Sequence, residues 1–266
     1  MQRYLGKKNF PFIKLSSRII SDYQGKLLAS GICDNTIGFY LHNIKALFRK
    51  GCREMGLELP CPFRDISIKT KKTLKRSLDP VVIKTLSAVE LEKDSSLSLA
   101  RDIFMFSFYT RGMSFVDIAL LKKRHVFSGE ICYRRHKTNQ LMRVGINREI
   151  SRILERYKNV PGEYIFPLFP AERDPYAGYR NAYHRIRYSL GKISRVIGLE
   201  FPLRLHAARH SWATIAKVNG ASVHVIGECL GHTSEKTTRI YLKELDHSAL
   251  DAVNNQVADF ILAVDD

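Results

Sequence analysis

Apolar residues recur every three or four positions along most of this chain, which is the spacing of amphipathic helices. In the first 60 residues this spacing predicts two helices, one that follows Ser16 and stops near Gly31, and a longer one that ends about Gly56. The polar run at residues 34–36 is expected to cap the second helix. The first block therefore predicts a small all-helical unit.

The same spacing continues to the end of the chain and is interrupted once by a strand pattern. Helices are expected at 80–92, 96–109, 114–121, 148–158, 177–198, 204–219, 221–230, 235–246 and 249–264. Strand-like runs at 131–135 and 141–146, joined by a polar turn, predict one β-hairpin. The expected fold class is mainly α, with an N-terminal helical domain and an α+β domain that contains one small antiparallel sheet.

A basic segment separates the two blocks. Residues 64–80 carry six Lys or Arg side chains and few apolar ones, which is typical of a linker. We therefore expect a helical domain at 1–63, a linker at 64–80, and a second domain at 81–266 that ends in an acidic helix at about 248–264.

The charge balance indicates a polyanionic partner. Lys and Arg number 43 against 26 acidic residues, a formal net charge of +17. Residues 1–80 hold 16 basic and 6 acidic residues, residues 81–240 hold 26 and 14, and residues 241–266 hold 1 and 6. We expect salt-dependent binding of nucleic acid. Charge alone leaves open a cationic surface without such a partner.

Other classes of protein are disfavoured by the sequence. The most apolar stretch, residues 103–109, is seven residues long and includes a serine, so it is too short to span a membrane, and the N-terminus lacks a secretory pattern. We see no clear basic amphipathic helix for a membrane surface. The five cysteines are scattered and never form a C-x-x-C pair, so we expect reduced thiols. A cytoplasmic, nucleoid-associated protein is expected.

Polar residues with chemical potential gather in the last quarter of the chain. His206 and Arg209 share a helical face, and His210 lies one turn beyond His206. Two histidines at i and i+4 suggest zinc, but zinc proteases have Glu where this chain has Ala207, so no metal is expected. Gly231 is suited to end one helix, and Ser234 is expected to cap the next.

Three motifs, in their order and spacing, resemble the C-terminal signature of the tyrosine recombinases, the phage-integrase family. They are His206-x-x-Arg209, Leu230-Gly231-His232 and Tyr241. The N-terminal half is similar to the core-binding domain of that family, with Asn35-Thr36 before a long helix and Cys61-Pro62-Phe63 before the linker. The usual family form has Asn before Pro-Phe. The resemblance covers nearly the whole chain and implies a SAM-like DNA-binding domain followed by a catalytic domain.

The resemblance implies strand exchange on duplex DNA without metal, ATP or other cofactor, because the phosphodiester is exchanged rather than hydrolysed. Tyr241 takes the role of the nucleophile that forms a 3′-phosphotyrosyl link. Arg209 takes the role of a phosphate clamp, and His206 and His232 donate to phosphate oxygens or move the tyrosine proton. Lys137 matches the hairpin lysine, the general acid; the alternative is a charged turn residue.

One position departs from the family pattern. The first catalytic arginine normally stands three residues before an acidic residue, but counting back from Asp117 gives Ser114. We expect Arg111, one helical turn earlier, to supply the missing cation. The next candidates are Arg134 and Arg143 of the hairpin. Asp117 is expected to orient an active-site arginine or histidine, with simple helix capping as the alternative.

The expected partners follow from the same resemblance. Duplex DNA is expected to contact basic residues of the first block and of the linker: Lys45, Arg49, Lys71, Lys72, Lys75 and Arg76. The linker alternative is a merely solvated charge run. The acidic tail is expected to dock on a neighbouring protomer in a tetramer on two paired sites, and the alternative is docking on its own subunit. An accessory DNA-bending protein is compatible with this scheme.

Three rival functions are compatible with the sequence. A relative that binds DNA but has lost catalysis would explain Ser114. A type IB topoisomerase uses similar residues and would relax plasmids as a monomer. A helical metalloenzyme built around His206 and His210 would lose its activity to chelators.

Overall fold

The computed structural model describes residues 4, 6, 10–68, 71, 77–169, 175–232 and 234–242, without the side chains of residues 175–177, 240 and 241. The chain divides into two units, Met1–Leu74 and Lys75–Asp266. Within the described residues, no helix is long and apolar enough to cross a membrane. Lys72, Lys75, Arg76 and the predicted helix at 248–264 lie outside the described residues.

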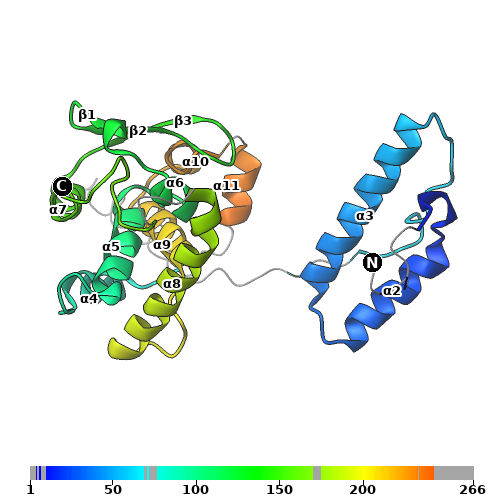
Figure 1. Cartoon of the computed structure of the whole chain (residues 1–266), viewed down its shortest axis with the longest axis horizontal. Helices are drawn as coiled ribbons and strands as arrows, with labels where there is room; N and C mark the ends of the chain where they lie inside the picture. Colours follow the sequence, from blue (N-terminus) through cyan, green and yellow to red (C-terminus); the bar gives the residue numbers. More distant parts are fainter. Residues whose placement is uncertain are drawn as a thin grey trace, which may run out of the picture. The chain divides into compact units, whose positions relative to one another are not determined.

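Two helices pack side by side in the first unit (Figure 1). They are α2 (Ser17–Ala29) and α3 (Asp34–Glu54), and a short 3-10 turn, η1 (Phe12–Lys14), precedes them. The Ser16 hydroxyl accepts a hydrogen bond from the Ile19 N–H and caps α2. The predicted pair of helices is confirmed. Their buried core consists of Ile20, Tyr23, Ile37, Leu41, Phe48 and Phe63.

The cap predicted for α3 is wrong. Cys33 is the N-cap residue, and no side chain caps this helix. The Asn35 amide instead donates to the Lys71 carbonyl at 2.8 Å and accepts from the Lys71 N–H at 2.7 Å. Asn35 therefore joins the start of α3 to a residue of the segment at 64–80, a contact between residues 36 positions apart.

Both ends of the segment at 64–80 belong to folded units. Ile66 and Ile68 pack against the core of the first unit. Leu78 is buried in the second unit, where its N–H donates to the Ser211 hydroxyl at 2.7 Å. The first unit thus extends beyond residue 63.

The second unit is a helical domain with one small sheet, as expected (Figure 1). Its helices are α4 (Pro80–Ala88), α5 (Ser96–Tyr109), α6 (Phe115–Ala119), α7 (Arg148–Arg156), α8 (Pro175–Val196), α9 (Leu205–Val218), α10 (Val223–Leu230) and α11 (Glu235–Tyr241), with a 3-10 turn, η2 (Lys123–His125). The helix predicted at 235–246 is described only to residue 241, and Ser234 stands at its N-cap without a side-chain capping bond.

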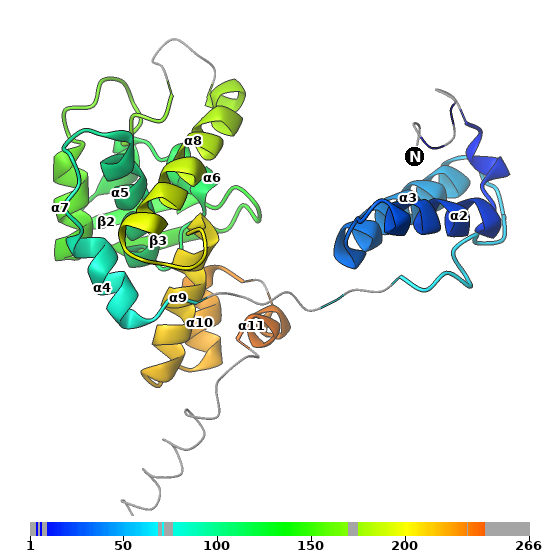
Figure 2. The same ribbon diagram turned by 90° about the horizontal axis from the view of Figure 1, so that it is seen from below.

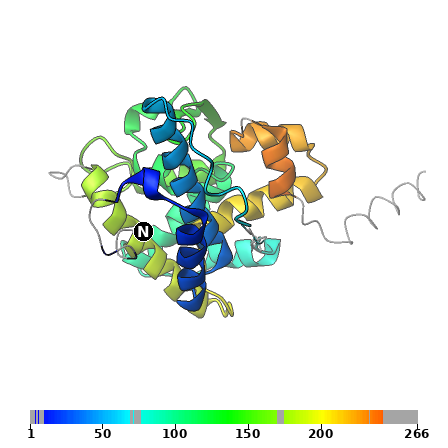
Figure 3. The ribbon, with the colours of Figure 1, turned by 90° about the vertical axis from the view of Figure 1, so that its right-hand side faces the viewer.

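Helix α5 lies at the centre of this unit and packs against α8 and α9 (Figure 2). The spacing of its apolar residues explains this position, because Ile103, Phe104 and Phe106 are fully buried and cover more than one helix face. Helices α10 and α11 pack on each other at the side of α9 (Figure 3). The residues of α9 are thereby held between the central helix and the C-terminal helix pair.

The sheet has the order β1-β2-β3 and is antiparallel throughout. The strands β2 (Glu130–Arg134) and β3 (Leu141–Gly145) confirm the predicted hairpin, with Tyr133 opposite Met142. The strand β1 (Val126–Phe127) was not predicted, since two residues are too short for an alternating pattern. Ile131, Tyr133, Met142 and Val144 point into the core.

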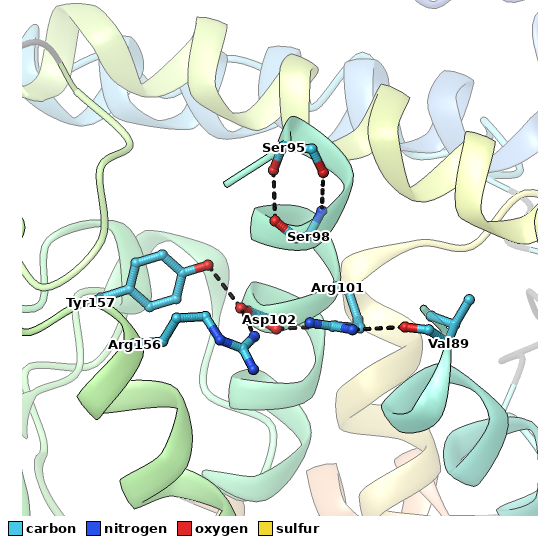
Figure 4. A network of polar contacts seen from close by, with 7 residues as sticks. All are labelled: Val89, Ser95, Ser98, Arg101, Asp102, Arg156 and Tyr157. Carbon is cyan, nitrogen blue, oxygen red and sulfur yellow. Dashed lines mark hydrogen bonds and ion pairs between the residues drawn. The ribbon is translucent and has the colours of Figure 1, made fainter. Parts of the chain in front are cut away.

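A buried carboxylate fastens α5 to α7 (Figure 4). Asp102 is 2% exposed and accepts hydrogen bonds from the Tyr157 hydroxyl at 2.8 Å, the Arg101 Nε at 3.1 Å, and the Arg156 guanidinium. Arg101 also donates to the Val89 carbonyl and so ties in the end of α4. Burial of these charges is compensated by pairing, so the network holds the central helix in place.

Candidate active site

Helix α9 carries three polar residues toward one region. Arg209 is 6% exposed, whereas His206 is exposed and His210 is half-buried. The two imidazole rings contact each other edge to face, with centroids 4.5 Å apart. A buried guanidinium needs acceptors for its five N–H groups, so the surroundings of Arg209 define the site.

Two helix ends supply those acceptors. Arg209 donates from one terminal nitrogen to the Gly112 carbonyl at 2.9 Å, just after α5. Its other terminal nitrogen donates to the Leu230 carbonyl at the end of α10 and lies 3.2 Å from the His232 Nε2. Since a helix C-terminus carries partial negative charge, two such ends stabilise the buried cation. Arg209 therefore links α5, α9 and α10.

The chain turns sharply after α5. Arg111 has the left-handed φ of +60° and Gly112 that of +75°, and the Gly112 N–H donates to the Ser107 carbonyl at 2.7 Å. This is the Schellman ending of a helix, in which glycine normally takes the position that Arg111 occupies. Strained backbone of this kind is typical of functional sites.

Helix α10 ends in the same way. Gly231 has a φ of +62°, as the sequence predicted, and the His232 N–H donates to the Gly227 carbonyl at 2.9 Å. A Cβ at Gly227 would lie 2.8 Å from the Thr238 hydroxyl, so glycine lets α11 approach. The two glycines place His232 between Arg209 and α11.

The contacts of His232 define its tautomer. A guanidinium has no acceptor, so the Nε2 of His232 accepts from Arg209. The Nδ1 then carries the proton and donates to the Thr238 hydroxyl at 2.9 Å. His232 is therefore held on both sides of its ring.

The hairpin of β2 and β3 carries Lys137, which belongs to the same unit as Arg209. Lys137 lies at the exposed turn between β2 and β3 and makes no hydrogen bond or ion pair within the described residues. The turn is closed by two bonds of Arg135, whose N–H donates to the Gln140 carbonyl and whose carbonyl accepts from the Asn139 N–H, both at 2.8 Å. The lysine is thus presented on an ordered turn.

Asp117 has a partner that differs from the predicted one. One carboxylate oxygen accepts from the backbone N–H of His136 at 2.8 Å, and the other accepts from the Ser114 hydroxyl at 2.6 Å. The Ser114 hydroxyl also caps α6. Asp117 therefore orients the hairpin backbone beside Lys137.

The electrostatic interactions of Tyr133, on β2, show which charged groups lie near the buried face of the hairpin. Burial raises the pKa of the Tyr133 hydroxyl, and the Asp117 carboxylate adds to the shift. Three guanidinium groups oppose it, in decreasing order those of Arg135, Arg209 and Arg111. Tyr133 stays protonated at neutral pH, and three cations lie around it.

The three candidates for the missing cation have different partners. Arg111 is close enough to the hairpin to donate to the Arg143 carbonyl at 3.4 Å. Arg143 is bound by Glu130 on the exposed side of the sheet, and Arg134 donates to the Asn139 carbonyl. Both hairpin arginines therefore have polar partners on the hairpin itself.

Arg135 is a site residue that the sequence pattern did not predict. Its guanidinium donates to the Gly231 carbonyl, next to His232. Strand alternation carried the signal, because residues 131, 133 and 135 share one face and the first two are buried. Arg134 and Arg143 lie on the opposite face.

The remaining predicted residues have simple positions. Tyr241 is the last residue of α11, and its side chain lies outside the described part of the chain. In the first unit, Lys45 is half-buried and Arg49 exposed on α3, whereas the Lys71 ammonium pairs with Asp34 at 2.9 Å. Across the described ranges, no group of three or more His, Cys, Asp or Glu residues is placed to hold a metal ion.

Comparison with known proteins identifies one family. The model of the Phage integrase family matches residues 77–247. Tyrosine recombinase XerD of Pseudomonas putida is 36% identical over 94 residues, which cover 33% of this chain and 30% of the relative. Tyrosine recombinase XerC of Bradyrhizobium diazoefficiens is 27% identical over 183 residues, 65% of this chain and 56% of the relative. The match thus covers less than two thirds of the length of each of these two relatives. XerC of Shewanella amazonensis is 22% identical and matches over 89% of this chain and 79% of its own length.

Solved structures agree on the fold. The Tn1549 transposon integrase in complex with circular intermediate DNA has a TM-score of 0.67 at 15% identity, covering 94% of this chain and 89% of that one. A lambda integrase dimer bound to a COC′ core site also has a TM-score of 0.67, at 17% identity, covering 92% and 87%.

Proposed function

The chain belongs to the phage integrase family, and from this premise we propose that it is a site-specific recombinase that cleaves and rejoins duplex DNA through a 3′-phosphotyrosyl intermediate. The observation that carries the proposal is the buried Arg209, held by two helix ends beside His232 and in the same unit as Lys137. Phosphoryl transfer needs fixed cations and a proton donor, and this arrangement offers both.

Strand cleavage proceeds by one exchange of bonds. The Tyr241 oxygen attacks the scissile phosphorus, a phosphorus–oxygen bond to the tyrosine forms, and the bond to the 5′ oxygen breaks. The tyrosine proton passes to the His206 imidazole, since both ring nitrogens of His232 are engaged by Arg209 and Thr238, and Lys137 protonates the departing 5′ oxygen. Rejoining reverses these steps with a 5′ hydroxyl as the nucleophile. The number of phosphodiester bonds is conserved, so the scheme needs no nucleotide hydrolysis.

The phosphate must be bound by more than one cation. Arg209 is preorganised, because its hydrogen bonds to the Gly112 and Leu230 carbonyls fix the plane of its guanidinium. We assign the second cation to Arg111, whose strained backbone and nearness to Tyr133 support the assignment. Ser114 contributes a hydroxyl to Asp117 instead.

We infer the binding partners from the net positive charge of the chain and from its family. We propose that duplex DNA contacts Lys45 and Arg49 of α3 together with the basic segment that contains Lys71, Lys72, Lys75 and Arg76. We further propose a tetramer on two paired sites, with the acidic C-terminal segment docked on a neighbouring protomer. An accessory DNA-bending protein, a mobile-element role and a location at the nucleoid are compatible with this function.

Covalent trapping tests the function. The protein is incubated with sheared genomic DNA of its source organism, denatured, and the DNA that remains attached is sequenced. We expect reads that share one pair of short inverted sequences. Trapping without any shared sequence, together with relaxation of supercoiled plasmid, would indicate a type IB topoisomerase. Binding without covalent attachment would indicate a relative that has lost catalysis.

Arginine substitutions test the second cation. We expect Arg111→Ala to slow single-turnover cleavage by about 10²-fold or more, since removal of one transition-state donor typically has this effect. Arg134→Ala and Arg143→Ala should cleave within about threefold of the unmodified protein, because surface charges bound elsewhere contribute little. Cleavage by Arg111→Ala at a near-normal rate would remove Arg111 from this role.

A further inference from the structure

The position of Lys137 depends entirely on what holds its hairpin. The lysine side chain has no partner within the described residues, and it lies at an exposed turn. The turn closes on itself through the backbone of Arg135. These bonds shape the turn, but they do not determine where the turn lies relative to Arg209 and His232.

Two contacts fasten this end of the hairpin to the rest of the unit. The His136 N–H donates to Asp117 of α6. The Arg135 guanidinium donates to the Gly231 carbonyl at the end of α10, across 96 positions of sequence. The two donors belong to Arg135 and His136, the two residues that immediately precede Lys137, so the turn is attached on two sides.

Gly231 is enclosed by the hairpin. A Cβ added at Gly231 would lie 2.8 Å from the Met142 sulfur and 3.4 Å from the Arg135 guanidinium. The preceding carbonyl, that of Leu230, is bound by Arg209, and the following residue is His232. Two arginines from different elements therefore bind two successive carbonyls, one arginine on the hairpin and one on α9.

The two sides of the contact between Arg135 and Gly231 differ in the other hydrogen bonds that hold them in place. His232 is held independently by Arg209 and by Thr238. The described tethers of the Lys137 turn to other elements include the Arg135 contact with Gly231 and the His136 bond to Asp117. We expect loss of the Arg135 contact to displace the lysine turn more than the histidine.

We propose that Arg135 is a positioning residue for strand cleavage, which holds the Lys137 turn at the correct distance from Arg209 and His232 by binding the Gly231 carbonyl. The inference rests on the proposed recombinase function. It differs from the assignment of Arg111, because Arg135 acts through the proton donor rather than on the phosphate.

A substrate whose leaving group needs no proton distinguishes a residue that acts through the proton donor from one that acts on the phosphate. The substrate is a nicked duplex with the sequence recovered by covalent trapping, made in two forms, with oxygen or with sulfur at the 5′ bridging position. A thiol has a pKa of about 8.5, so a thiolate departs without a general acid, unlike an alkoxide. We measure the rate of covalent protein–DNA formation on both forms.

We expect Arg135→Gln to slow cleavage of the oxygen substrate by about 10²-fold, the scale of a displaced catalytic group, and to cleave the sulfur substrate within about threefold of the unmodified protein. Lys137→Ala should show the same pattern. Arg135→Lys retains one donor and should recover part of the oxygen rate. Arg152→Gln removes an exposed cation bound to Glu149 on α7 and should behave as the unmodified protein on both substrates.

The outcomes are distinct. If Arg135→Gln cleaves the oxygen substrate at the normal rate, the inference is wrong. If it is equally slow on both substrates, Arg135 acts on the phosphate or on folding, and the inference is again wrong. If the unmodified protein never attaches to DNA, the recombinase function itself fails.

Discussion

Replacement of Tyr241 by phenylalanine should abolish covalent attachment to DNA, with a loss of at least about 10⁴-fold in the single-turnover rate, as is typical when a nucleophile is removed. The phenyl ring keeps the size of the side chain and loses only the oxygen that attacks phosphorus. Binding should persist, because affinity for duplex DNA comes mainly from contacts between cationic side chains and phosphates.

Denaturing gel electrophoresis of the nicked-duplex reaction measures the covalent product, and a filter-binding titration at fixed salt measures affinity. We expect Tyr241→Phe to bind within about twofold of the unmodified protein. Tyr133→Phe is a matched control among the tyrosines of the second unit, since the Tyr133 side chain is only 7% exposed and is packed in the core. Covalent product with phenylalanine at position 241 would show that another residue attacks the DNA, and the proposed mechanism would be wrong.

Gly112→Ala should have the next largest effect, on both activity and stability. An added Cβ would lie 2.8 Å from the Arg209 Cα and closer still to its side-chain carbons. Because the neighbour is backbone, the chain after α5 must move away from α9, and the bond from Arg209 to the Gly112 carbonyl is lost. We expect cleavage to fall by about 10²-fold or more, since a misplaced phosphate ligand has this effect.

The same substitution also places alanine at a φ of +75°. Left-handed backbone costs about 1 kcal/mol in a residue with a Cβ, and overpacking adds about 1–3 kcal/mol to the loss in the free energy of unfolding. Gly162→Ala separates these causes, because Gly162 has a φ of +83° and open space around its Cβ position. Thermal unfolding and cleavage are measured for both variants. Equal behaviour of the two would show that the approach of Gly112 to Arg209 is unimportant.

The cations of this chain are arranged differently from the family pattern. The family pattern expects an arginine where this chain has Ser114, and the Ser114 hydroxyl is committed to Asp117. Arg111 and Arg135 approach the site from the α5 turn and the hairpin. We therefore expect catalysis to depend on two arginines outside the usual position, one for charge and one for position.

Several features of the site were predictable because they depend on neighbours in the sequence. The spacing His206-x-x-Arg209 places both residues on one helix face, and a glycine at 231 ends α10 in the left-handed conformation. The hairpin around Lys137 followed from its two strand-like runs. Local patterns of this kind act through backbone preferences and helix geometry, which few residues determine.

Other features failed to follow from local patterns. Asn35 was expected at a helix cap, but its amide binds the backbone of Lys71. Asp117 was expected to orient a side chain, but it binds the backbone N–H of His136. In both cases a polar residue was correctly singled out, and its partner lay too far away in the sequence to be identified.

The sequence by itself therefore determined the helices, the hairpin, the family and the residue types that the chemistry requires. The tertiary structure alone decided which cations gather around Arg209, through contacts that span 96 positions between Arg135 and Gly231 and 97 between Gly112 and Arg209. The physical reason is that a buried guanidinium must be satisfied by whatever carbonyls packing brings to it, and packing joins helix ends that no local pattern connects.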